Sequence, residues 1–189
     1  MPRYAAFLRA INVGGHTVKM DALRGIFESL GLNGVATFIV SGNVVFEAPE
    51  DDAPTLERRI SLGLLEALGY EVACFVRSME ELAEIAAHQP FTAAELEGAV
   101  SVNVAFTAAA VSAEEERRLR EHRTDIDDFR VRGREVYWLC RRRQSESTFS
   151  NAALEKTLGR PSTLRGVSTV TKIRARFAGG GGRGSSQPV

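Results

Sequence analysis

A loop rich in glycine and polar side chains follows the first apolar segment of the chain. Residues 4–10 are apolar on both faces and predict a buried strand. The loop after this segment carries a guanidinium, a side-chain amide and two adjacent glycines, at Arg9, Asn12, Gly14 and Gly15. Adjacent glycines let backbone N–H groups come close to a ligand. The loop is therefore a candidate site for a small anionic or polar ligand.

A second candidate is a basic patch in the later part of the chain, able to bind phosphates. Its six members are Arg141, Arg142, Arg143, Arg160, Arg165 and Lys172. The first three leave a predicted strand, where arginines are also common as a solvated edge. A sheet that recognises RNA would need exposed aromatic residues. Tyr4 and Phe7 lie among apolar neighbours instead, which favours their burial.

The sequence gives little support to metal or cofactor chemistry. The three histidines, His16, His88 and His122, are far apart, and the chain has no HxxxH or CxxC spacing, so no metal site is expected. The phosphate-loop ending Gly-Lys-Ser/Thr and the GxGxxG pattern are also missing, so we expect no cofactor. His16 lies beside the glycines and could act as an acid or base, or could simply be solvated. Whether the protein is an enzyme is left open.

The first 78 residues alternate between strand-like and helical periodicity. Strands are expected at 4–10, 36–41, 44–47 and 72–77, and helices at 20–30 and 55–68. Gly42-Asn43 predicts a two-residue hairpin turn between the second and third strands. The order strand-helix-strand-strand-helix-strand is that of a ferredoxin-like unit.

The pattern restarts after residues 79–99, which are expected to form short connecting helices. Strands are expected at 100–106, 129–132 and 135–141, and helices at 112–122, 151–158 and 168–177. The final strand that symmetry requires is missing from this pattern, and the last helix takes its place. The prediction is an α+β protein with two ferredoxin-like (βαββα-type) halves that share a core. The halves are 1–78 and the degenerate 100–178, and residues 179–189 form a disordered Gly/Ser-rich tail.

This fold brings the first loop to the predicted hairpin. In a ferredoxin-like sheet the strands lie in the order four-one-three-two with antiparallel neighbours, so the end of the first strand lies beside the start of the third. Lys19, at the mouth of the next helix, could add a second cation. The predicted ligand-binding residues are Arg9, Asn12, Gly14, Gly15, Lys19, Ser41, Gly42 and Asn43. The alternative is structural, because the same glycines and asparagines suit tight turns.

Two stretches resemble the signature of the bacterial domain of unknown function 1697 family. They are Leu8-Arg-Ala-Ile-Asn-Val-Gly-Gly15 and Ser41-Gly-Asn-Val-Val-Phe46. A late segment, Leu154-Glu-Lys156 with Leu158-Gly-Arg160, is similar to the family's C-terminal signature. The resemblance implies an α+β protein with two ferredoxin-like halves and implies no established reaction. The family usually has Arg-Asn-Trp where this chain has Arg165-Gly166-Val167, so the amide and the aromatic ring are missing here.

Length and composition set the remaining expectations. The chain has 189 residues, 44% of them hydrophobic, enough for one ordinary domain or two small ones that share a core. No apolar run approaches the ~20 residues of a membrane helix, and the N-terminus lacks a signal-peptide pattern, so no membrane partner is expected. Two cysteines, Cys74 and Cys140, are too few for a disulfide scaffold, which favours the reducing cytoplasm.

Charge is unevenly divided along a chain whose formal net charge is zero. Residues 1–99 carry a net charge of −7 and residues 100–189 a net charge of +7. A basic half can bind a polyanion, or it can pack against an acidic half. Three functions therefore stay open: binding of a small anionic or polar ligand at the loop and hairpin, nucleic-acid binding through the basic half, and a scaffold or interaction role without a ligand.

Overall fold

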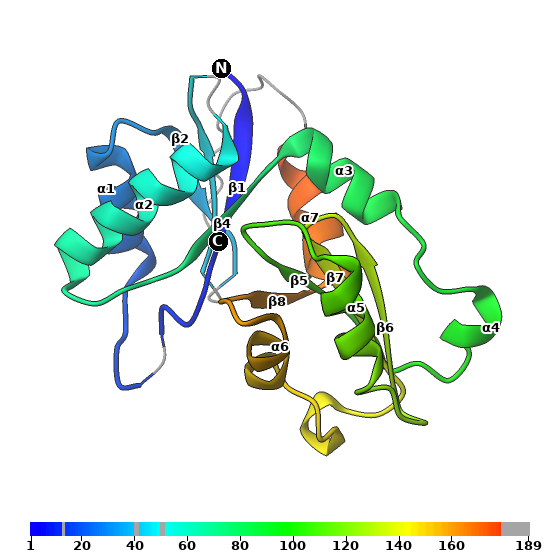
Figure 1. Ribbon diagram of the computed structural model, residues 1–189. Coiled ribbons are helices and arrows are strands. Elements are labelled where there is room, and N and C mark those ends of the chain that lie inside the picture. The colour runs from blue at the N-terminus through cyan, green and yellow to red at the C-terminus, as the bar shows by residue number, and fades with distance from the viewer. Residues whose placement is uncertain (13, 40–41, 50–51, 179–189) are drawn as a thin grey trace, which may run out of the picture.

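Four strands and two helices build the first half of the molecule in the computed structural model, which describes residues 1–12, 14–39, 42–49 and 52–178. In chain order they are β1 (Arg3–Leu8), α1 (Met20–Ser29), β2 (Asn33–Thr37), β3 (Asn43–Glu47), α2 (Ala53–Leu68) and β4 (Cys74–Ser78). The sheet has the order β2-β3-β1-β4 with antiparallel neighbours, which confirms the predicted ferredoxin-like arrangement (Figure 1). Both helices lie on one face of this sheet.

Local sequence signals explain where α2 begins and ends. The Asp52 carboxylate accepts the Thr55 N–H at 2.7 Å, and Pro54 occupies the first turn, where its missing N–H costs nothing. Gly69 ends the helix with φ +79°, a left-handed conformation that glycine adopts without strain. The helix lays its apolar stripe on the sheet because leucine and isoleucine recur at helical spacing, at Leu56, Ile60 and Leu64.

The connection between β2 and β3 differs from the predicted two-residue hairpin. β2 ends at Thr37, and β3 begins at Asn43, so the link is longer than Gly42-Asn43 alone. Ile39 has φ +58°, which no strand residue adopts, and the strand therefore cannot extend through it. The side chain of Asn43 donates to Phe38 O at 2.9 Å, and Asn43 O accepts the Phe38 N–H, so the turn closes between these two residues.

The second half repeats the order of the first. Its elements are β5 (Ser101–Phe106), α5 (Ala113–Arg120), β6 (Asp127–Arg132), β7 (Glu135–Cys140), a short 3-10 turn η1 (Gln144–Glu146), α6 (Asn151–Leu158), β8 (Thr163–Gly166) and α7 (Val167–Phe177). The sheet order is β6-β7-β5-β8. Two helices precede this half: α3 (Met79–Ala87) and the single-turn α4 (Ala93–Leu96).

The prediction that the second half lacks its last strand is wrong. β8 pairs antiparallel with β5, from Asn103–Gly166 to Phe106–Thr163, and α7 follows β8 rather than replacing it. β8 has only four residues and reads Thr-Leu-Arg-Gly, so it shows no apolar alternation. Its pairing comes from tertiary contacts. The predicted tail, residues 179–189, lies outside the described residues.

A shared core joins the halves, as predicted. One buried cluster contains side chains of both sheets and of α3 and α7, and these two helices pack against each other (Figure 1). The rings of Phe7 on β1 and Phe106 on β5 stack with their centroids 4.1 Å apart, so the sheets touch directly at this point. The outer faces are covered by α1 and α2 on one sheet and by α5 and α6 on the other.

Candidate functional site between the two halves

The end of β1 meets the start of β3, as the predicted site requires. Phe7 is the register partner of Asn43, and the Leu8 N–H donates to Gly42 O at 2.8 Å. Ser41 lies outside the described residues. The structure therefore brings Arg9, Gly42 and Asn43 to one edge of the first sheet.

The rest of the predicted loop turns outward. The Asn12 side chain accepts the Val18 N–H at 2.8 Å and so braces its own loop, while Gly14, Gly15 and Lys19 are exposed. Gly14 and Gly15 have φ +71° and +85°, and no atom lies within 4 Å of an added Cβ at either position. These glycines allow the chain to turn in a solvent-exposed loop.

Arg9 reaches across to the second half. Its guanidinium forms a two-pronged ion pair with Glu155 on α6, with Nη2 2.8 Å from Oε2. The hydrogen bond to Glu155 raises the pKa of Arg9. Glu155 also accepts the Ser162 N–H at 2.8 Å. The pKa of Glu155 is lowered, because these hydrogen bonds and the Arg9 charge outweigh the opposing effect of burial.

Asn43 and Arg165 form a buried contact between the halves. Asn43 is 1% exposed, and its Oδ1 accepts from Arg165 Nε at 2.6 Å. Arg165 also donates to Leu8 O at 2.9 Å, and its guanidinium lies 5.8 Å from the centroid of the Phe7 ring. Burial lowers the pKa of Arg165 to about 10, so the side chain is charged at neutral pH. Arg165 is thus an internal contact of the fold rather than part of a surface patch.

Arg77 on β4 makes the reciprocal contact. It is fully buried, and it donates to Glu135 Oε1 at 2.7 Å and to Thr107 O at 2.9 Å in the second half. Its guanidinium lies 5.3 Å from the centroid of the Phe106 ring. Burial lowers the pKa of Arg77, and the Glu135 carboxylate opposes that effect. Each half therefore inserts one arginine into the other.

The remaining basic candidates lie on separate elements. Arg160, after α6, pairs with Glu115 on α5 at 2.8 Å. Arg141 donates to Glu95 O at 3.4 Å at the end of β7, where Arg142 and Arg143 are exposed. Lys172 is exposed on α7. Because Arg165 is internal and Arg160 is paired, these six residues do not form one continuous surface.

A cleft lies where the halves meet, next to Arg9. We call it the inter-half cleft, and its lining residues are Pro54, Glu57, Arg58, Ser61, Ala73, Cys74, Phe75, Ala108, Arg160 and Pro161. Its volume is about 380 Å³. The Arg9 N–H donates to Ala73 O at 2.9 Å, which places the end of β1 against its wall. Ligand sites often occur at such junctions between domains.

Two groups in this cleft are unusual. Glu57 is 8% exposed, its Oε1 accepts the Val76 N–H at 2.8 Å, and burial raises its pKa despite nearby Arg77 and Arg134. The Nε of Arg160 is buried and has no hydrogen-bond partner among the described residues. Two residues of the cleft lining, Glu57 and Arg160, thus carry a buried carboxylate and a buried N–H donor.

Sequence reasoning missed the residues that tie the halves together. Arg77 lies in a strand whose other inward positions are apolar. A charged residue at such a position is the one feature of the sequence that indicates a buried partner for Arg77. Glu57, Glu135 and Glu155 gave no comparable signal, since single glutamates on helices and at strand ends are common on solvated surfaces. Glu135 and Glu155 pair with Arg77 and Arg9 of the first half, and Glu57 lies 3.8 Å from Arg134 of the second half.

Three further observations concern the described parts of the chain. Within residues 1–12, 14–39, 42–49 and 52–178, no cluster of three or more His, Cys, Asp or Glu side chains could hold a metal ion. No helix in those same ranges combines the length and apolar character needed to cross a membrane. Cys74 and Cys140 are both buried and unbridged.

The fold and the paired arginines define a class: α+β proteins made of two ferredoxin-like halves joined through a shared core. The chain belongs to the family described as protein of unknown function DUF1697, whose model matches residues 1–137. No curated protein matches the chain in sequence.

A solved structure has a similar fold. It is that of the conserved bacterial protein SP0830 from Streptococcus pneumoniae, with a TM-score of 0.69 and 21% sequence identity. The match covers 95% of this chain and 99% of that one. The likeness therefore extends over both halves and concerns the fold.

Proposed function

We propose that the protein binds a small anionic ligand in the inter-half cleft. The observation that carries the proposal is the buried Nε–H of Arg160, which no oxygen accepts within the described residues. A buried donor without a partner is costly, and an anionic oxygen would satisfy it with a strong, charge-assisted bond. Arg58 on α2 adds a second, exposed guanidinium to the same cleft.

The other lining groups restrict the chemistry of the ligand. Ser61 offers a hydroxyl, and the walls at Ala73, Phe75 and Ala108 are apolar. Glu57 would repel an anionic group placed against it, but its carboxylate can accept a bond from a ligand hydroxyl. A carboxylate or phosphate bearing a hydroxyl, with its charge at the arginines, fits this pattern. The proposal concerns binding and includes no catalytic step.

The proposed site keeps the predicted ligand class and shifts its place. Arg9 and Asn43 each bind a residue of the second half and so hold the two halves together. Neither residue lines the cleft itself. The two buried, unbridged cysteines support a cytoplasmic protein. No observation favours nucleic-acid binding over this ligand, because the basic residues are separated.

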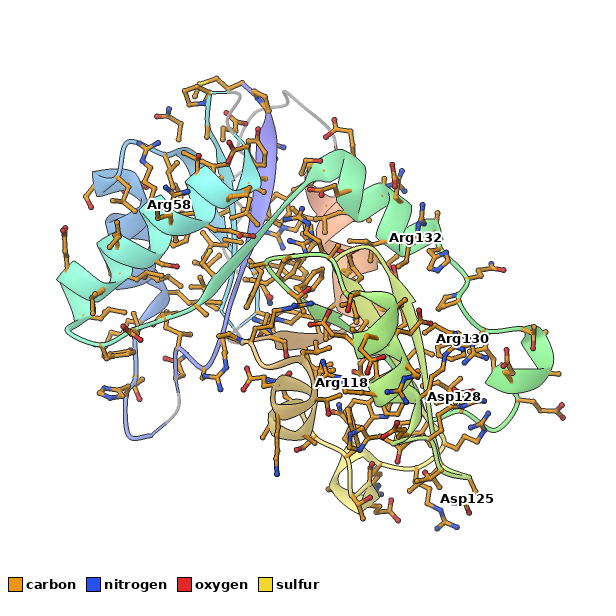
Figure 2. All side chains as sticks on the ribbon, viewed as in Figure 1. Arg58, Arg118, Asp125, Asp128, Arg130 and Arg132 are labelled. Atoms are coloured by element: carbon orange, nitrogen blue, oxygen red, sulfur yellow. The ribbon has the colours of Figure 1, made fainter. Side chains whose placement is uncertain are left out.

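Thermal-shift titrations with inorganic phosphate and with citrate test the proposal. We expect at least one of them to raise the melting temperature above a sodium chloride control of equal ionic strength. Arg58→Gln should lose most of that shift. Arg118→Gln is the matched control, because Arg118 is an exposed arginine on α5 that does not line the cleft (Figure 2).

Arg160→Gln should lose the shift as well, although it also breaks the pair with Glu115. The proposal fails if neither anion stabilises the wild-type protein. It fails equally if Arg58→Gln and Arg118→Gln respond alike to the anion that does.

A further inference from the structure

Tyr137 on β7 has a buried hydroxyl that lacks a partner within the described part of the chain. The residue is 1% exposed, and no described residue hydrogen-bonds its Oη. Its ring packs in the shared core and makes an edge contact with His88, with ring centroids 5.0 Å apart. Buried hydroxyls in folded proteins are normally bonded to protein or to an ordered molecule. The hydroxyl therefore indicates an unidentified partner.

A small cavity separate from the inter-half cleft adjoins this tyrosine. Its lining residues are Glu81, Glu84 and Ile85 of α3, Arg132 of β6, and Glu135 and Tyr137 of β7. Figure 2 shows Arg132 beside α3, which forms the opposite wall. The volume is about 90 Å³. A single water needs roughly 10–15 Å³ on this measure, so the cavity has room for a ligand of a few heavy atoms.

Tyr137 lines the cavity beside charged side chains. Burial and the Glu135 carboxylate together raise the pKa of Tyr137 to about 12, against the opposing charges of Arg132 and Arg77. The phenol is therefore protonated at neutral pH and can both donate and accept a hydrogen bond. Tyr137 lines the cavity together with Glu135 and Arg132.

The charges of the cavity favour a cation. Three carboxylates and one guanidinium line it. Glu135 bonds Arg77 through Oε1, and Glu84 bonds Arg132 through Oε2 at 3.4 Å, so each keeps a second carboxylate oxygen. Glu81 accepts from Arg134 and from the Ser78 N–H, which fixes its carboxylate. Glu84 and Glu135 can thus each offer a carboxylate oxygen to a donor in the cavity.

We propose that this cavity binds the ammonium group of a small primary amine, which donates hydrogen bonds to Tyr137 Oη and to the carboxylates of Glu84 and Glu135. An ammonium has three donors and no acceptor, which matches the acceptors that Glu84, Glu135 and Tyr137 contribute to the cavity lining. The cavity is too small for a large substituent, so the amine carries a short chain. This site is independent of the anion site in the inter-half cleft.

Methylammonium chloride is the probe, compared with sodium chloride and tetramethylammonium chloride at equal ionic strength. We expect methylammonium alone to raise the melting temperature, by roughly 2 °C or more. Tetramethylammonium has the same charge but no N–H donors, so it should behave like sodium. Equal shifts with methylammonium and sodium would overturn the proposal.

Tyr137→Phe removes only the hydroxyl and should abolish the methylammonium shift. Tyr70→Phe is the matched control, because the Tyr70 hydroxyl donates to Ile11 O in the first half and is far from the cavity walls. Glu84→Gln, at a residue whose side chain is 70% exposed, should fold normally and weaken the shift. A full shift in Tyr137→Phe would show that the hydroxyl bonds only to solvent and would overturn the proposal.

Discussion

Arg77 and Arg165 occupy the same position in the two sheets, and each reaches into the opposite half. Arg77 is the register partner of Ala5 on β1, and Arg165 is the register partner of Val104 on β5. Each bonds a carbonyl at the end of the other half's first strand, at Thr107 and Leu8 respectively. Each guanidinium also lies near a core phenylalanine of the opposite half.

The two arginines differ in the side chain that accepts their hydrogen bond. Arg77 meets the carboxylate of Glu135 at the start of β7, and Arg165 meets the amide of Asn43 at the start of β3. Phe106 pairs with Glu135 and Phe7 with Asn43, so the two acceptors also occupy equivalent positions. The same backbone geometry thus supports an ion pair on one side and a charge–dipole contact on the other. We infer that the Arg77 side of the interface is the stronger.

Replacing each arginine with methionine tests this difference most strongly. Arg77→Met leaves the Glu135 carboxylate, whose side chain is only 13% exposed, without its cation, so we expect a loss of about 3–5 kcal/mol in the free energy of unfolding. Arg165→Met leaves only neutral oxygens unbonded, and we expect a loss of about 1–3 kcal/mol. Urea unfolding measures both. If Arg165→Met costs more than Arg77→Met, the ranking of the two sides is wrong.

A smaller difference in stability loss is expected between glycine-to-alanine substitutions in the two hairpins. Gly42 has φ +74°, and an added Cβ would lie 3.0 Å from Ile11 Cγ2 and 3.2 Å from Leu8 Cβ. Gly133 has φ +59°, but its nearest neighbour would be Glu135 Oε2 at 3.8 Å. Gly42→Ala should therefore cost about 2–3 kcal/mol, from strain and crowding together, and Gly133→Ala about 1 kcal/mol, from strain alone.

Urea unfolding of both alanine variants measures these losses in the free energy of unfolding. Gly14→Ala provides a control for strain without crowding, because Gly14 has φ +71° and open space around it. Equal losses in Gly42→Ala and Gly14→Ala would show that the first hairpin is no more tightly packed than the open loop.

The smallest expected effect is on the pH dependence of stability, and it concerns two glutamates, each the fifth residue of its helix. Burial raises the pKa of Glu57 on α2, whereas the pKa of Glu155 on α6 is lowered because its hydrogen bonds and the Arg9 charge outweigh burial. Glu155 therefore contributes stability above the usual glutamate pKa and loses it as pH falls through the lowered value. The pKa shift of Glu57 has the opposite sign, so the contribution of Glu57 to stability is lost as pH rises through the raised pKa.

We expect Glu155→Gln to cost about 1 kcal/mol at neutral pH and less in acid. Glu57→Gln keeps an acceptor for the Val76 N–H, and its stability relative to wild type should improve as pH rises. Unfolding free energies measured from about pH 3 to about pH 7 would show both trends. Parallel pH curves for the two variants would contradict the assigned shifts.

The fold could be predicted because its signals are local. Helical spacing predicted α2, α5 and α6, and the structure shows that local signals set their ends: Gly69 and Gly159 end α2 and α6, and Ser112 with Glu115 caps the start of α5. β8 escaped because a four-residue strand with an internal arginine has no alternation to detect. The β2 boundary shifted because the positive φ of Ile39 belongs to the closed turn and cannot be seen in the side-chain pattern.

The candidate site was predicted only in outline. Element order correctly placed Gly42 beside the end of β1, since antiparallel pairing fixes that contact. The sequence could not show that the Asn43 amide is occupied by Arg165, because those residues are far apart in the chain. Nor could it show that Arg9 has Glu155 as its partner. Single polar residues do not reveal a partner that only the docking of the two halves supplies.

The sequence by itself determined the two ferredoxin-like halves, because hydrophobic periodicity and helix-ending glycines act over a few residues. The tertiary structure alone decided which charges became internal. Burying Arg77, Arg165 and Glu57 is tolerable only when the opposite half, or the neighbouring strand, supplies oriented partners, and that requires the whole core to form. It also decided where an N–H and a hydroxyl remain without a partner among the described residues, and these groups mark the two ligand sites proposed for this protein.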